Sequence, residues 1–213
     1  MFLTYNPYAP AAPSTALPRT WFAQGQGLLI VRSGWDESAS MFGAHFPAQQ
    51  PYIDHQVSYV GDFQLYRRGA WAVTHPLTYG GPGVTGEGVN TLLHSGFGSM
   101  LEFRDVAGAE WDAAGTYAYI SGTTGGQKYA DSYYQPPPTF LHEWTRTLVY
   151  LPATGGGADA IVVFDRSHAE HPRQLPRFER YSAADRNTIM DSPALRQWII
   201  HTPVNPSISG NTI

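Results

Sequence analysis

The sequence contains no cysteine, only one lysine and no long apolar run. Without cysteine there is no disulfide, no thiolate nucleophile and no cysteine-bound zinc. No run approaches the ~18 apolar residues that a membrane-crossing helix needs, so we expect no membrane span. Charged residues make up 14% of the chain, against a typical ~25%, and the net charge is −4. Such a surface neutralises phosphates poorly, so nucleic acid is not an expected partner.

Glycine, proline and aromatic residues are abundant instead. The 213 residues include 22 glycines and 17 prolines, and 14% are aromatic. This mixture argues against a helical bundle or a coiled coil and favours short strands joined by turns. With 42% hydrophobic residues, the chain can bury the core of one all-β domain, a class that commonly runs to ~200–250 residues.

The predicted elements are short, evenly spaced strands. The clearest hairpin covers residues 59–74, where apolar and polar positions alternate around a turn at 67–69. A second hairpin joins 147–151 to 160–164, and further strands are expected at 27–32, 91–93, 101–104, 116–121 and 198–201. This pattern predicts an all-β fold, an antiparallel β-sandwich with little helix.

Two parts of the chain are predicted, a linker over residues 1–19 and a sandwich domain over residues 20–213. Prolines keep the linker extended, and it lacks the basic segment of a signal peptide. Residues 207–213 hold a turn and the start of a strand without a closing element. We therefore expect the sandwich to be part of a larger protein.

Residues 54–71 (DHQVSYVGDFQLYRRGAW) resemble the central motif of the heparinase II/III-like polysaccharide lyases. In that family, an H-x-D-x-G-x-F strand leads into F-x-L-Y-R-x-G-x-W. Further similar segments follow the family order at 32–35 (RSGW), 90–93 (NTLL), 146–150 with 162–166, and 198–211. The resemblance covers about residues 17–213 and implies the β-sandwich that follows an (α/α) toroid in secreted or periplasmic lyases.

The resemblance implies that an uronic-acid polysaccharide, such as a glycosaminoglycan or alginate, is cleaved by β-elimination. A base removes the proton next to the uronate carboxylate, an acid protonates the leaving oxygen, and the carboxylate must be neutralised. In the family, the toroid supplies much of this machinery, whereas the sandwich contributes a histidine and often metal ligands. Here Val57 and Val89 stand at family histidine positions, and valine can neither move protons nor bind metal.

The candidate catalytic residues are His55, close to the family's histidine position, and Tyr59 as a proton donor. Together with His55, the histidines His75 and His94 are candidate ligands for zinc, and the resemblance allows calcium as well. Histidines without a metal-binding spacing are more often surface or hydrogen-bonded residues, and this reading stays open beside the metal site.

The candidate substrate-binding residues are two arginines and two tyrosines. Arg67 and Arg68 at the hairpin tip can pair with a uronate or a sulfate, although arginines on a turn are commonly just solvated. Tyr133 and Tyr134 precede three prolines and can form a platform that stacks on sugar rings. Because the isolated sandwich lacks a toroid, we expect little turnover from it. Two alternatives remain, a carbohydrate-binding domain that has lost the site and a domain that docks to a helical partner.

Overall fold

The computed structural model describes residues 13–47, 60–75, 90–94, 105–112, 114–125, 141–153, 157–169, 196–198 and 200–204. In these ranges the chain forms a short 3-10 turn at Ser14–Ala16 and eleven strands. The strands are β1 (Thr20–Ala23), β2 (Leu28–Arg32), β3 (Ser40–His45), β4 (Asp62–Arg67), β5 (Ala70–Val73), β6 (Leu92–His94), β7 (Asp105–Trp111), β8 (Ala118–Gly125), β9 (Leu141–Leu151), β10 (Ala160–Ala169) and β11 (Arg196–Trp198). None of the described residues belongs to a helix long and apolar enough to cross a membrane.

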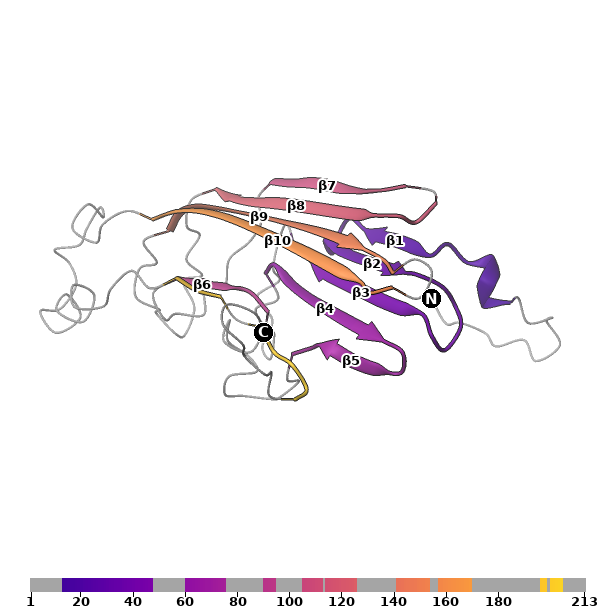
Figure 1. Cartoon of the computed structure of the whole chain (residues 1–213). Helices are drawn as coiled ribbons and strands as arrows, with labels where there is room; N and C mark the ends of the chain where they lie inside the picture. The colour runs from indigo at the N-terminus through magenta and orange to yellow at the C-terminus, as the bar shows by residue number, and fades with distance from the viewer. Residues whose placement is uncertain are drawn as a thin grey trace, which may run out of the picture.

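The strands form two stacked antiparallel sheets (Figure 1). One sheet has five strands in the order β1-β2-β3-β4-β5, and the other has four in the order β10-β9-β8-β7. The short strands β11 and β6 pair separately. The architecture confirms the prediction of an all-β antiparallel sandwich.

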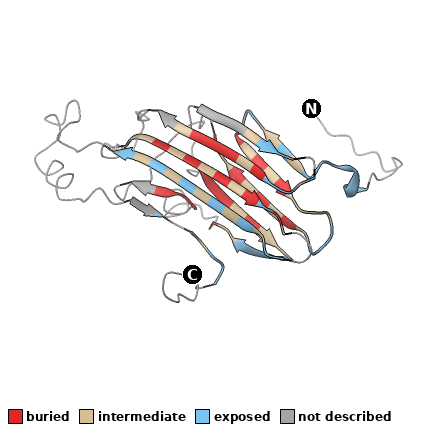
Figure 2. Cartoon of the chain, turned by 45° about the horizontal axis from the view of Figure 1, so that its top comes forward, coloured by how far each residue is buried: buried red, intermediate tan, exposed pale blue. Residues whose placement is uncertain are grey.

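The core lies between the two larger sheets, because each strand turns every second side chain inward. Burial alternates in this way along β3, and Figure 2 shows the same red and tan alternation on the neighbouring strands. Across the interface, the rings of Phe42 and Tyr150 stack with centroids 4.8 Å apart. The buried apolar residues include Leu29, Val31, Phe42, Ala44, Phe63, Ala118, Ile120, Trp144, Leu148 and Tyr150.

Both predicted hairpins are present, with corrected bounds. The β4–β5 turn holds Arg68 and Gly69 at positive φ, as its sequence position suggests. The strands of the second hairpin are longer than the sequence indicated, and His168 is an exposed residue of β10. The predicted strand at 101–104 lies outside the described residues.

A carboxylate joins the two sheets near the β4–β5 turn. The hydroxyls of Tyr150 and Ser40 donate hydrogen bonds to the two oxygens of Asp159, at 2.7 and 2.8 Å. Arg67 Nε lies 2.8 Å from the same carboxylate. Burial, followed by the hydrogen bond to Asp159, raises the pKa of the Tyr150 phenol well above its usual value of 10.0.

This contact predicts a loss of stability in alkali. Because its folded pKa is raised, Tyr150 contributes stability below pH about 10 that is lost as the pH rises beyond it, at up to ~1.4 kcal/mol per pH unit. Urea unfolding of Tyr150→Phe should therefore show a flatter decline above pH 10 than the wild type. The matched variant Tyr117→Phe removes an exposed hydroxyl and should follow the wild-type curve. Equal slopes for all three proteins would contradict this assignment.

Candidate functional site

The structure describes some of the predicted site residues. His55, Tyr59, Tyr133 and Tyr134 lie outside the described residues, and so do Val57 and Val89. The backbone of His94 lies on β6, opposite Arg196 of β11. His75, Arg67 and Arg68 are described with their side chains, and the predicted roles of the whole set stay predictions.

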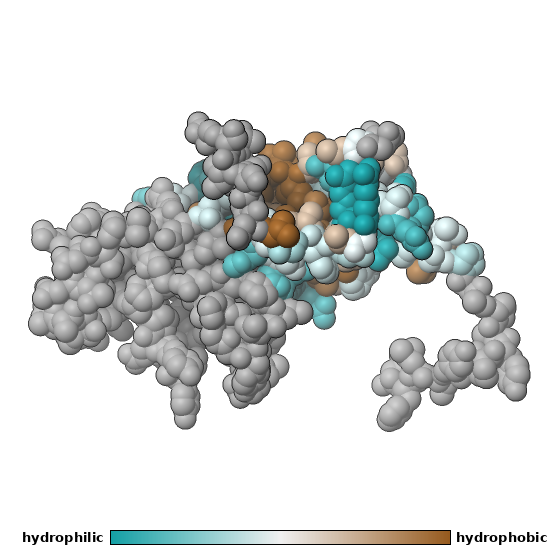
Figure 3. All heavy atoms as spheres, turned by 60° about the horizontal axis from the view of Figure 1, so that its bottom comes forward, coloured by the Kyte–Doolittle hydropathy of each residue, from teal (hydrophilic) through white to brown (hydrophobic). Residues whose placement is uncertain are grey.

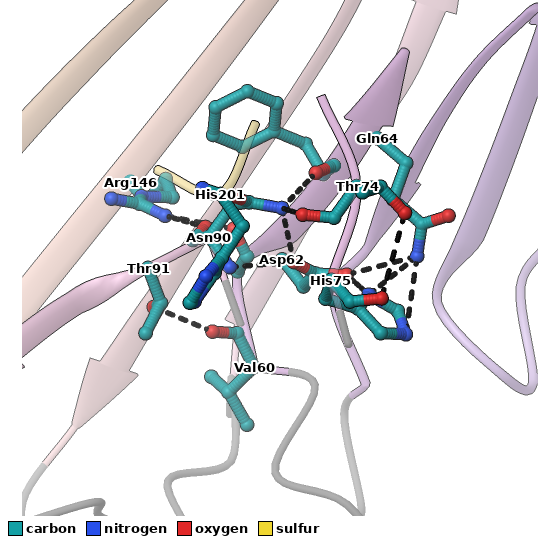
Figure 4. Close-up of polar contacts among 11 residues, drawn as sticks. Val60, Asp62, Gln64, Thr74, His75, Asn90, Thr91, Arg146 and His201 are labelled. Atoms are coloured by element: carbon teal, nitrogen blue, oxygen red, sulfur yellow. Dashed lines mark hydrogen bonds and ion pairs between the residues drawn. The ribbon is translucent and has the colours of Figure 1, made fainter. Parts of the chain in front are cut away.

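His75 is buried directly after β5 and pairs with the first residue of β4. Its Nδ1 atom lies 2.9 Å from Oδ2 of Asp62, and their side chains are 7% and 4% exposed. The amide nitrogen of Gln64, two residues further along β4, contacts both ring nitrogens of His75 (Figure 4). The hairpin thus brings a carboxylate, an imidazole and an amide together at one end of the five-stranded sheet.

Asn90 fixes the position of this pair. Its backbone N–H donates to Asp62 Oδ1 at 2.8 Å, and its side-chain amide donates to the carbonyls of Phe63 and Thr74 at 2.9 and 3.0 Å. Its side-chain oxygen accepts a hydrogen bond from the backbone of His201 at 2.6 Å. One buried asparagine therefore holds both strand ends of the hairpin together, as Figure 4 shows.

Behind Asn90 lies a fully buried arginine of the other sheet. Arg146 on β9 is 0% exposed, and its Nη1 atom donates to the carbonyls of Gly61 and Asn90 at 2.8 and 3.0 Å. Its Nε and Nη2 atoms bind both oxygens of Asp165 on β10, at 2.8 and 2.7 Å. A two-pronged pair of this kind neutralises a charge that would be very costly to bury alone.

Asp165 also receives two indole N–H groups. Trp144 and Trp198 each donate to it at 2.8 Å. Burial by itself raises the pKa of Asp165, but the hydrogen bond and the charge of Arg146 outweigh it, and the pKa lies below its usual value. The carboxylate is therefore ionised at neutral pH. Hydrogen bonds run without a break from Trp198 through Arg146 to Asn90 and Asp62.

A second histidine stands beside the pair. His45 on β3 is the register partner of Asp62. Burial lowers the pKa of His45, while the negative charge of Asp62 opposes that change. A buried imidazole that stays neutral at pH 7 can accept a proton, which is the property required of a general base.

The described residues do not form a complete metal site. No group of three His, Asp or Glu side chains in them converges as metal ligands. Asp62 and His75 supply two ligands, whereas zinc sites use three or four protein ligands.

The two arginines of the hairpin tip differ in their surroundings. Arg67 is held by Asp159, and it also donates to the carbonyl of Gly157 at 2.6 Å. Arg68 is exposed at the turn. Arg67 therefore forms an ion pair within the fold, and the sequence did not predict this pairing.

Comparison with known proteins finds structural similarity only. No protein-family model matches the sequence, and a search of curated proteins finds no match. Two solved structures are similar in fold, the heparan sulfate lyase HepC from Pedobacter heparinus and a mutant of it. Each is 17% identical, with TM-scores of 0.48 for the lyase and 0.49 for the mutant, over 71% and 75% of this chain. The chain spans less than a quarter of either lyase chain (22% and 23%).

Proposed function

We propose that this chain is the β-sandwich part of a polysaccharide-lyase-like protein that binds uronic-acid polysaccharides. In a longer, secreted or periplasmic protein that also carries a helical toroid, it takes part in their β-elimination. Support comes from the ordered sequence motifs, the sandwich fold and the buried pair of Asp62 and His75. The contact between Asp62 Oδ2 and His75 Nδ1 carries the proposal.

In this function His75 acts as the general base. Asp62 accepts a hydrogen bond from Nδ1–H and so fixes the tautomer in which Nε2 holds the lone pair. The Gln64 amide nitrogen, 3.4 Å from His75 Nε2, gives way to the substrate. His75 Nε2 then takes the proton next to the uronate carboxylate, and Asp62 stabilises the imidazolium that forms. Asn90 keeps the carboxylate in place through its backbone N–H.

A non-catalytic carbohydrate-binding domain is the second candidate. Trp21 and Trp71 favour it, because their side chains are 52% and 38% exposed on the five-stranded sheet. Exposed indole rings provide apolar faces on which sugar rings can stack. This candidate requires binding of the polysaccharide but no proton transfer by His75.

Hydrogen exchange on the sugar separates the two candidates. The 213-residue chain is incubated in D2O with a uronate oligosaccharide, and NMR follows loss of the proton next to the carboxylate. Exchange reports the base alone, because it does not require the leaving oxygen to be protonated. We expect exchange with the wild type and a decrease of about 10²- to 10⁴-fold in His75→Gln.

Two further variants make the exchange test specific. Asp62→Asn should also slow the exchange, because the amide no longer holds the Nδ1–H tautomer by its charge. His168→Gln changes an exposed histidine on the other sheet and should exchange like the wild type. Binding of the oligosaccharide without exchange by the wild type would overturn the catalytic proposal and favour the binding domain.

A further inference from the structure

We propose that the outer face of the five-stranded sheet holds an anion subsite, formed by Arg32 and Trp35, for a carboxylate or sulfate group of an acidic saccharide. The outer face is the side turned away from the core. Strand register places one row of side chains there from Arg32 through Met41 and Tyr66 to Trp71. The inference names the ligand class of the proposed polysaccharide site and rests on that function.

Arg32 is a half-buried cation without an acidic partner. Its Nη2 atom contacts the sulfur of Met41 at 3.7 Å, and its guanidinium lies 4.7 Å from the ring centre of Trp35. A thioether and a ring face leave its N–H donors without a strong acceptor, and no carboxylate among the described residues pairs with it. Arginine favours planar, two-pronged recognition of carboxylates, and guanidinium groups also bind other oxyanions.

Trp35 supplies the second observation. Its indole Nε1 is the one buried side-chain polar atom of the described residues that has no hydrogen-bond partner. Buried donors are nearly always satisfied in folded proteins, so an unpaired one needs a physical reason. An anion beside Arg32 would accept from the guanidinium, and also from the indole N–H once a small movement of the Trp35 side chain uncovers the buried Nε1. Two neighbouring donor groups, one without an acceptor and one with only a thioether as its acceptor, indicate a ligand of negative charge.

The surroundings suit a sugar. Tyr66 and Trp71 make an edge-to-face pair with ring centres 5.3 Å apart in the same row. The next row holds Gly43, and a Cβ placed there would meet no atom within 4 Å. A small side chain at this position would therefore meet no neighbour. Figure 3 shows that hydrophobic and strongly hydrophilic residues adjoin on the sandwich surface that it draws.

The subsite binds a different sugar unit of the polymer from the unit that lies at His75. Met41, the register partner of Arg32, lies four residues before His45, the register partner of Asp62. Four residues of strand span about 13 Å. An extended acidic chain along β3 would place one unit at the pair of Asp62 and His75 and a neighbouring charged unit at Arg32. Arg32 therefore contributes binding and selection of the polymer but not proton transfer.

The test measures affinity for defined probes by tryptophan fluorescence and calorimetry. The probes are an alginate hexasaccharide, its carboxyl-reduced form, and a heparan sulfate hexasaccharide with and without its sulfates. Arg32→Gln should weaken binding of the acidic probe about 10- to 100-fold and leave binding of the reduced probe unchanged. Trp35→Phe keeps the ring, removes the N–H and should weaken acidic binding about 3- to 10-fold. Arg166→Gln, the same charge change at an exposed site on β10, should change it less than about twofold.

The outcomes show which anionic group is bound and whether the subsite exists. A loss on carboxyl reduction identifies the carboxylate as the bound group, and a loss on desulfation identifies the sulfate. Equal losses in Arg32→Gln and Arg166→Gln, or no binding by the wild type, would overturn the subsite. Two controls separate lost binding from lost folding. Urea unfolding measures the stability of each variant, and Arg32→Lys, which keeps the charge, should restore part of the affinity. If binding depends on Arg32 but the proton next to the uronate carboxylate does not exchange, the catalytic role of His75 is refuted and the subsite is not.

Discussion

Substitution of Arg146 by methionine is expected to lower the free energy of unfolding by about 3–5 kcal/mol, a large part of a domain's total of about 5–15 kcal/mol. The guanidinium is completely buried between the sheets, and its loss leaves the Asp165 carboxylate without its cation. The carbonyls of Gly61 and Asn90 lose their donor at the same time. Methionine fills much of the volume, so the effect reports charge and hydrogen bonding more than a cavity.

The matched control is another arginine–carboxylate pair between the same two strands. Arg166 on β10 contacts Glu143 on β9 at 2.7 Å, but the two side chains are 67% and 41% exposed. Arg166→Met should change the stability by no more than about 1 kcal/mol. Urea unfolding measures both variants, and equal effects would contradict the assignment. If Arg146→Met does not fold, the double variant Arg146→Met/Asp165→Asn, which removes the orphaned charge, should recover folded protein.

Substitution of Gly27 by alanine is expected to cost about 3 kcal/mol. Gly27 has φ of +61° in the turn between β1 and β2, a conformation that costs other residues ~1–2 kcal/mol. An added Cβ would also stand only 1.8 Å from the carbonyl oxygen of Phe46, so the backbone must move. Such overpacking adds ~1–3 kcal/mol.

Gly25, two residues earlier in the same turn, provides the comparison. A Cβ there meets no atom within 4 Å, and its φ is not positive. Gly25→Ala should therefore change the stability by less than about 0.5 kcal/mol. Thermal unfolding of both proteins gives the answer, and similar melting temperatures for Gly25→Ala and Gly27→Ala would refute the steric account.

The sequence predicted the hairpins because the features that define a hairpin lie within one short segment. Alternation with period two and a tight turn define the β4–β5 hairpin within sixteen residues. Strand β3 was missed, because its sequence SMFGAH has no β-branched residue and a central glycine. It forms because Phe42 and Ala44 face the core, a tertiary effect that a single segment does not reveal.

The candidate site could be predicted only in part for the same reason. His75 was identified as a residue of interest, but as a metal ligand, and its partner Asp62 was not. Pairing within the hairpin brings the two side chains together. A count from the turn, where Arg67 pairs with Ala70, places Asp62 opposite His75, and the β-bulge between Leu65 and Tyr66 shifts this register by one residue. The signal that could have found Asp62 is this count along the predicted hairpin.

Long-range contacts explain the remaining differences. Arg67, a candidate substrate-binding residue, pairs with Asp159 from the second hairpin, and no sequence pattern links the two. Arg32 and Trp35 were noted only as a motif. Their unpaired donors became visible once the positions of all neighbouring acceptors were known.

Binding of acidic polysaccharides by the unmodified 213-residue chain is the property that both proposals require. Calorimetric titration with heparan sulfate, alginate, hyaluronan and ulvan is compared with carboxyl-reduced alginate, at two salt concentrations. The account predicts saturable binding of at least one acidic polymer, weaker binding at higher salt, and little binding of the reduced polymer. Absence of binding to all four, or equal binding of alginate and its reduced form, would contradict it.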